Sequence, residues 1–276
     1  MAHVTKRRPR ALVTGASAGI GAAFAERLAR DQYDLIVVAR RREKLEALTG
    51  RLQESQQVRV EVMVADLTQL NDLRTVERRI ADEADLDLLV NNAGLGGYMP
   101  FVSLTPDRAE ELIRLQVVAV TRLARAALPG MVARAHGAII NVSSRLAFSA
   151  TLSAPHLPKR TVYSATKAYI NTFTQMLHME LEGTGVRVQA LCPGIVRTEF
   201  HERMGMDPAR FPAELVMSPE DVVEASLAGL RLGEVICIPA LGDPSLLAPV
   251  DDSQRRLWEG SGSGSLAARY RAQRNQ

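Results

Sequence analysis

Short, uninterrupted apolar runs alternate with longer amphipathic stretches along most of the chain. Fully apolar runs of this length are typical of strands buried on both faces, whereas the longer stretches carry apolar residues at helical spacing. The predicted strands are residues 11–14, 35–39, 58–64, 86–91, 138–142, 186–192 and 234–238. The predicted helices are residues 22–30, 41–53, 70–81, 106–135 and a further one that carries Tyr163.

The alternation of strands and helices predicts the fold class. Such chains form βαβ units with right-handed crossovers, so that the strands lie parallel in one sheet. We therefore expect an α/β fold, a single doubly wound Rossmann-type domain with a mostly parallel seven-stranded sheet. Residues 1–9 would be a basic extension, 10–258 the domain, and 259–276, which lack a sustained apolar face, a mobile tail.

Composition narrows the class of protein. The formal net charge is only +3, and the basic clusters at 6–10 and in the tail lack interleaved aromatic residues, so no nucleic-acid partner is expected. We see no membrane span and no signal peptide. Cys192 and Cys237 lack zinc-ligand spacing, and two thiols in 276 residues favour a reducing compartment. We expect a soluble cytoplasmic protein with no metal site.

A glycine-rich turn follows the first predicted strand. Gly15, Gly19 and Gly21 would let the backbone approach a pyrophosphate and would direct the N-terminus of the next helix at it. The alternative is a glycine turn without a ligand, and this spacing differs from the commoner Gly-x-Gly-x-x-Gly. The position of the turn, directly after the first strand, favours a nucleotide site.

The end of the second predicted strand indicates which dinucleotide would bind. It reads Ala39-Arg40-Arg41, with no carboxylate before Glu43. An acid here would bind a ribose 2′-hydroxyl and repel a 2′-phosphate, whereas arginine binds that phosphate through charge-assisted hydrogen bonds. We expect NADP(H) rather than NAD. The alternative is that these arginines only solvate the start of a helix.

Tyr163 and Lys167 lie four residues apart on a predicted helix, so their side chains share one face. An ammonium group nearby stabilises phenolate and lowers the pKa of the phenol, which allows proton transfer at a carbonyl or an alcohol. Taken alone, such a pair is more often a solvated helix face.

Tyr163 and Lys167 belong to one of five short segments that follow one another along the chain. Together they resemble the short-chain dehydrogenase/reductase family over roughly residues 10–240. The segments are 14–21 (TGASAGIG), 91–94 (NNAG), 141–144 (NVSS), 163–167 (YSATK) and 193–198 (PGIVRT).

The resemblance implies a set of catalytic residues. Tyr163 would be the acid in carbonyl reduction and the base in alcohol oxidation, and Lys167 would lower its pKa and hold the nicotinamide ribose. Ser144 would hydrogen-bond the substrate oxygen, with Ser143 the weaker candidate. Where the family usually carries an asparagine that helps to hold a relay water, this chain has Gln116, whose amide lies one methylene further out.

The resemblance also implies the cofactor contacts, all at carboxyl ends of strands, where open α/β sheets bind ligands. Asp66 and Leu67 would meet the adenine, and Pro193 and Ile195 would flank the nicotinamide. The complete cofactor set is Gly15, Ser17, Gly19, Ile20, Gly21, Arg40, Arg41, Asp66, Leu67, Asn92, Ala93, Gly94, Tyr163, Lys167, Pro193, Ile195 and Thr198.

Two segments would border the substrate. The family carries a substrate lid at about 199–218, which here contains Phe200, Met204, Met206, Phe211 and Met217 and so suits a hydrophobic substrate. The loop 149–159, which contains His156, is longer than usual in the family. A loop histidine beside prolines is more often simply exposed than catalytic.

These observations predict an NADP-dependent oxidoreductase that transfers hydride between nicotinamide and a carbonyl or secondary alcohol, most simply a ketone or aldehyde reductase. The alternative is a non-catalytic NADP-binding regulator or sensor on the same fold, for which Gln116 is the only support. The long helices on either side of residues 138–142 could pair with those of other copies, so we expect a homodimer or homotetramer.

Overall fold

Seven parallel strands form the central sheet, in the order β3-β2-β1-β4-β5-β6-β9. The chain runs from β1 outward to β3 and then returns to the other side of β1 for β4. This reversal opens a crevice at the carboxyl ends of β1 and β4. The strands are β1 (Arg10–Thr14), β2 (Asp34–Ala39), β3 (Val60–Val64), β4 (Leu86–Asn91), β5 (Gly137–Val142), β6 (Val186–Leu191) and β9 (Ile236–Cys237).

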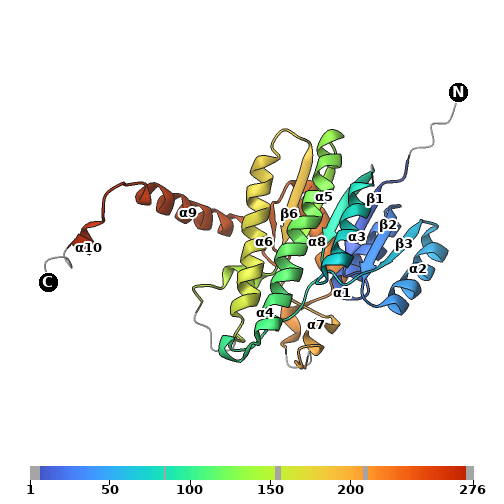
Figure 1. Ribbon diagram of the computed structural model, residues 1–276, viewed down its shortest axis with the longest axis horizontal. Helices are drawn as coiled ribbons and strands as arrows, with labels where there is room; N and C mark the ends of the chain where they lie inside the picture. Colours follow the sequence, from blue (N-terminus) through green and yellow to red (C-terminus); the bar gives the residue numbers. More distant parts are fainter. Residues whose placement is uncertain (1–6, 84, 153–156, 208–210, 272–276) are drawn as a thin grey trace. The chain divides into compact units, whose positions relative to one another are not determined.

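Helices cover both faces of this sheet (Figure 1). One face packs against α1 (Gly19–Arg30), α2 (Arg42–Gln56) and α8 (Pro219–Leu232). The other packs against α3 (Leu70–Ala81), α5 (Val120–Ala133) and α6 (Thr161–Glu180). The predicted α/β fold with a seven-stranded parallel sheet is therefore confirmed.

Alternate residues of each central strand enter the two cores. Val13 and Val90 lie in the core under α1 and α8, whereas their neighbours Leu12 and Leu89 lie in the core under α3 and α5, and all four are fully buried. This two-sided burial is the reason that the strands read as continuous apolar runs.

The computed structural model describes residues 7–83, 85–152, 157–207 and 211–271. They fall into two units, Met1–Pro239 and Ala240–Gln276. The second contains η6 (Pro244–Leu247), α9 (Ala248–Ser261) and α10 (Ala268–Arg271), and its described side chains are mostly exposed. The helix α9 spans the predicted division between residues 258 and 259.

The long helix predicted at 106–135 is not uniform. It begins as α4 (Pro106–Ile113), widens to a π-helical turn, η2 (Arg114–Ala119), and continues as α5. Among the described residues, Pro106–Ala133 is long and apolar enough to cross a membrane, but buried core helices meet the same criterion. Leu112, Leu123 and Met131 of this stretch are fully buried in the protein, as in the core helix of an α/β domain.

Short elements complete the first unit. A two-residue ladder joins β7 (Ile195–Val196) to β8 (Val216–Met217), too short a pattern to be predicted from the sequence. The other short elements among the described residues are η1 (Phe101–Ser103), η3 (Arg145–Phe148), α7 (Glu199–Glu202) and η5 (Ala213–Leu215).

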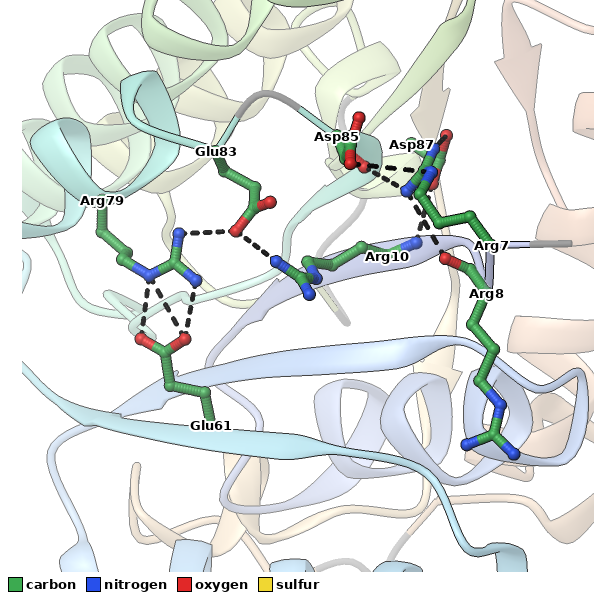
Figure 2. A network of polar contacts seen from close by, with 8 residues as sticks. All are labelled: Arg7, Arg8, Arg10, Glu61, Arg79, Glu83, Asp85 and Asp87. Atoms are coloured by element: carbon green, nitrogen blue, oxygen red, sulfur yellow. Dashed lines mark hydrogen bonds and ion pairs between the residues drawn. The ribbon is translucent and has the colours of Figure 1, made fainter. Parts of the chain in front are cut away.

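A network of charged side chains joins the amino ends of β1 and β4, at the sheet edge opposite the crevice (Figure 2). Glu83 accepts from Arg10 at 2.6 Å and from Arg79 at 2.7 Å. Arg7, in the basic extension, donates to Asp87 at 3.0 Å, and the other oxygen of Asp87 accepts from the backbone of Arg10 at 2.7 Å. The network thus attaches the extension to the domain.

Candidate active site

The turn between β1 and α1 has the backbone shape of an anion-binding loop. Gly15 has φ +69°, in the left-handed region that favours glycine. A Cβ on Gly21 would lie 2.4 Å from the carbonyl oxygen of Gly15 and 2.4 Å from Nδ2 of Asn92, so no larger residue fits there. Because α1 has no side-chain cap, its first backbone N–H groups are available to an anionic ligand.

Two arginines follow β2, and Arg41 is the more firmly held. Its Nε and Nη2 donate to Oγ of Ser17 at 3.1 and 3.0 Å, and its Nη1 donates to Glu199 at 2.8 Å. Arg40 is more exposed and lies 3.6 Å from the carboxylate of Asp66. The cationic group beside the glycine turn is therefore chiefly that of Arg41.

Ser144, Tyr163 and Lys167 converge at the carboxyl end of β5. Ser144 follows the strand, and the other two lie on the first turns of α6, and all three are at most 6% exposed. Ser144 and Tyr163 line the same cavity, and Oγ of Ser144 accepts from the backbone N–H of Leu146 at 3.1 Å. Nζ of Lys167 lies 5.6 Å from the ring centroid of Tyr163 and donates to the carbonyl of Val142 at 2.8 Å.

Burial controls the protonation of this group. It raises the pKa of Tyr163 to about 12, although hydrogen bonds from Tyr98 and Ser144 act in the opposite direction. Burial also lowers the pKa of Lys167 to about 8. At neutral pH Tyr163 is thus a protonated phenol beside an ammonium group.

Several predicted residues brace the site. Nδ2 of Asn92 donates to the carbonyl of Thr14 at 2.8 Å, which fixes the end of β4 to the end of β1. Oγ of Ser143 donates to the carbonyl of Lys167 at 2.9 Å and so positions α6. Asp66 accepts from the backbone and the hydroxyl of Thr68, at 3.0 and 2.8 Å.

Gln116 lies on the π-helical turn, with 1% of its surface exposed. Its Nε2 donates to the carbonyl of Leu95 at 2.6 Å, and its Oε1 accepts from the hydroxyl of Thr166. Its side-chain amide therefore joins the loop after β4 to α6, and these contacts do not include Lys167.

One cavity of about 710 Å³ unites these residues. It extends from Arg41 and the glycine turn to Ser144, Tyr163 and Lys167. Its lining includes all predicted site residues except Gly21, which packs under the turn, and Gln116.

The lid segment, residues 199–218, and the loop before α6 border the same cavity. Phe200, Met204, Met206 and Phe211 line it, whereas Met217 packs against the hydrophobic core. Residues 208–210 and residues 153–156, which include His156, lie outside the described residues.

Tyr98 is a site residue that the sequence reasoning missed. Its ring lies edge-on to that of Tyr163, with centroids 5.0 Å apart, and its presence lowers the pKa of Tyr163 against the larger effect of burial. Phe200 lies 6.4 Å from Tyr98 and 6.2 Å from Tyr163, which completes an aromatic group of three rings. The available signal for Tyr98 was its position in the loop that follows β4, four residues after Gly94.

Comparison with known proteins agrees with this geometry. A sequence model of the family described as short chain dehydrogenase matches residues 9–208. The chain belongs to the short-chain dehydrogenase family. Among curated proteins, this short-chain dehydrogenase is 34% identical over 200 residues to hydroxysteroid dehydrogenase-like protein 1 of Gallus gallus, with 71% of this chain covered. The match spans 59% of that relative's length.

Solved structures resemble the short-chain dehydrogenase over nearly its whole length. A short-chain dehydrogenase from Sphingobium yanoikuyae in complex with NADPH is 38% identical, with a TM-score of 0.89, and the match covers 95% of this chain and 100% of that one. The bulky-bulky ketone specific alcohol dehydrogenase from Comamonas testosteroni is 34% identical, with a TM-score of 0.85 and coverage of 95% and 98%.

The family uses a nicotinamide cofactor, and the residues of this short-chain dehydrogenase fit one. The left-handed glycines Gly15 and Gly19, which line the cavity, and the uncapped N-terminus of α1 suit a diphosphate. The cavity continues from there to Tyr163, so that one elongated ligand can touch both ends.

Proposed function

We propose that this protein is an NADP(H)-dependent oxidoreductase that transfers hydride between nicotinamide and a carbonyl or secondary alcohol carbon, with reduction of ketones or aldehydes as the main direction. The observation that carries the proposal is that the buried residues Tyr163 and Ser144 line the same cavity as Arg41 and the glycine turn.

When bound, the cofactor supplies the hydride, and the protein supplies the proton and the geometry. Tyr163 would donate its proton to the carbonyl oxygen, while the hydroxyl of Ser144 holds that oxygen. The raised pKa of Tyr163 keeps the phenol protonated at neutral pH, which suits reduction rather than oxidation. Lys167 would hold the nicotinamide ribose.

The preference for NADP(H) rests on the end of β2. Arg41 and Ser17 form a cationic, hydrogen-bonding corner there. Two acids border this corner: Glu199 lies 2.8 Å from Arg41, and Asp66 lies 3.6 Å from Arg40. Arginine recognises a phosphate through several donors at once. The NADPH complex of the Sphingobium yanoikuyae protein supports the same preference.

We also propose a bulky, apolar carbonyl substrate. Tyr98, Phe200, Phe211 and Met204 line the substrate end of the cavity, and flexible Met side chains adapt to varied shapes. The specificity named for the Comamonas testosteroni enzyme, bulky-bulky ketones, is consistent with such a lining.

The test is to follow NADPH absorbance with a panel of ketones and aldehydes of increasing size, using the purified protein and Tyr163→Phe. We expect turnover that favours bulky aryl ketones and is lost by at least about a thousandfold in the variant, since the proton donor is removed. Preference for small ketones would contradict the substrate class.

A non-catalytic NADP-binding role is not favoured, because a sensor does not need a buried proton donor beside the cofactor. Tight NADPH binding without turnover on any carbonyl of the panel would support it.

A further inference from the structure

Glu199, the first residue of α7, lies against the cations beside the glycine turn. Its Oε2 accepts from Nη1 of Arg41 at 2.8 Å, and its Oε1 accepts from Nζ of Lys44. Arg203, one turn further along, also pairs with this carboxylate. Hydrogen bonds from Lys44 and Arg41 lower the pKa of Glu199 to about 2, so it is ionised at physiological pH.

These contacts commit most of the donors of Arg41. Nε and Nη2 are directed at Ser17 and Nη1 at Glu199. A 2′-phosphate that binds Arg41 must therefore share this guanidinium with the carboxylate or displace it. Since both groups are anionic and only a few ångströms would separate them, they repel each other.

Movement of Glu199 would also move Phe200, the next residue of α7. Thr198 caps α7 by accepting from the backbone N–H of Phe200 at 3.3 Å, and Phe200 directly follows Glu199. The ring of Phe200 packs against Tyr98 and Tyr163. Thus α7, only four residues long, carries one side chain at the phosphate end of the cavity and the next at the catalytic end.

We propose that Glu199 is a determinant of cofactor specificity: its carboxylate competes with the 2′-phosphate of NADP(H) for Arg41, and phosphate binding releases α7 from Arg41. A cofactor without this phosphate leaves the carboxylate in place. This inference rests on the proposed function, because it requires a nicotinamide cofactor in the cavity.

The first experiment measures dissociation constants of NADPH and NADH by calorimetry for the native protein, Glu199→Gln and Glu202→Gln. Glu202 is the matched control, an exposed acid on the same helix with no side-chain partner among the described residues. We expect Glu199→Gln to bind NADPH about fivefold more tightly, because one competing charge has been removed. Its affinity for NADH should be unchanged. The control should change neither value.

Unchanged or weaker NADPH binding by Glu199→Gln would overturn the proposal, because Glu199 would then only steady Arg41. Failure of the native protein to bind either nucleotide would instead refute the proposed function, so the two failures are distinct.

A second experiment reports on α7 without turnover. Hydrogen exchange of residues 199–206 is compared with adenosine 2′,5′-bisphosphate and with 5′-AMP, which differ only in the 2′-phosphate. We expect faster exchange with the bisphosphate in the native protein and no difference in Glu199→Gln. Slower exchange with the bisphosphate in the native protein would contradict release of α7.

Discussion

At Tyr163, burial and hydrogen bonding oppose each other. Burial raises the pKa of the phenol, whereas the neighbouring hydroxyl groups of Tyr98 and Ser144 lower it and so favour phenolate. Lys167, four residues on, is directed to the carbonyl of Val142. The reactivity of Tyr163 therefore depends on neighbours from the loop after β4 and from the end of β5 as well as on its own helix.

Tyr98→Phe should alter the pH dependence of the reaction while leaving the fold intact. The hydroxyl group of Tyr98 lowers the pKa of Tyr163, so its loss raises that pKa and the phenolate needed for alcohol oxidation forms at higher pH. We expect oxidation at fixed pH to fall roughly threefold to tenfold and its pH profile to shift to higher pH.

Steady-state kinetics of alcohol oxidation between pH 6 and 10 would test this. Tyr169→Phe is the matched control, because its hydroxyl bonds to Thr121 on the outside of the protein. An unshifted profile in Tyr98→Phe would mean that Tyr98 serves packing alone.

At the scale of the element, the turn between β1 and α1 requires glycine because its backbone segments pack too closely for a side chain. Gly21 lies against backbone that cannot move aside, namely the carbonyl of Gly15. The π-helical turn at Gln116 is a second specialised element, and its side-chain bonds to Leu95 and Thr166 connect the loop after β4 with α6. Both elements shape the backbone around the cavity rather than supply reactive groups.

Gly21→Ala should weaken NADPH binding by more than about tenfold, because the added Cβ displaces the turn from its close approach to the cofactor. Titration of nucleotide binding would measure this. Gly50→Ala is the control: Gly50 is helical in α2, and, beyond its chain neighbours and the backbone of its own helix, no atom of the described residues lies within 4 Å of an added Cβ. That change should leave binding unaltered and stabilise the protein by about 0.5–1 kcal/mol. Equal NADPH affinity in both variants would contradict the assignment of the turn.

At the scale of the whole molecule, the ligand-binding cavity and the charged network that stabilises the fold lie at opposite ends of the strands. The carboxyl ends of the strands carry the cavity, and the amino ends carry the charged network of Figure 2. Glu83 is central to that network, with 9% of its side chain exposed between Arg10 and Arg79.

Glu83→Gln should lower the free energy of unfolding by about 1–3 kcal/mol at pH 7, since two charge-assisted hydrogen bonds are weakened. Burial alone would raise the pKa of Glu83, but hydrogen bonds from Arg10 and Arg79 hold it below its usual range. The stabilisation is therefore present above the unfolded-state pKa and lost as the pH falls through the folded-state value.

Urea denaturation at pH 7 and below pH 4.5 would test this, with Glu54→Gln on the exposed side of α2 as the control. A difference between Glu83→Gln and the native protein that did not shrink in acid would contradict the linkage.

We further predict a homodimer or homotetramer. Met176 and Met179 of α6 are 52% and 63% exposed, and Val132 of α5 is 41% exposed, which is apolar surface that a second copy can bury. Light scattering coupled to size-exclusion chromatography should show an oligomer that Met176→Lys with Met179→Lys weakens. A native monomer at micromolar concentration would refute this prediction.

Much of the fold followed from local patterns. Apolar runs predicted the strands because both sheet faces are buried, and the glycine spacing predicted the turn because Gly15 and Gly21 occupy positions closed to other residues. The π-helical turn was not predictable, since the apolar spacing of 106–135 fits a regular helix equally well.

The sequence by itself determined the fold class, the family and the candidate residues Ser144, Tyr163 and Lys167, because their order and spacing are properties of the chain. Only the tertiary structure decided that the ring of Tyr98 packs edge-on against Tyr163 and that Glu199 binds Arg41, 158 positions away. Such contacts depend on how loops from separate strands pack at one edge of the sheet, and no local pattern encodes that packing.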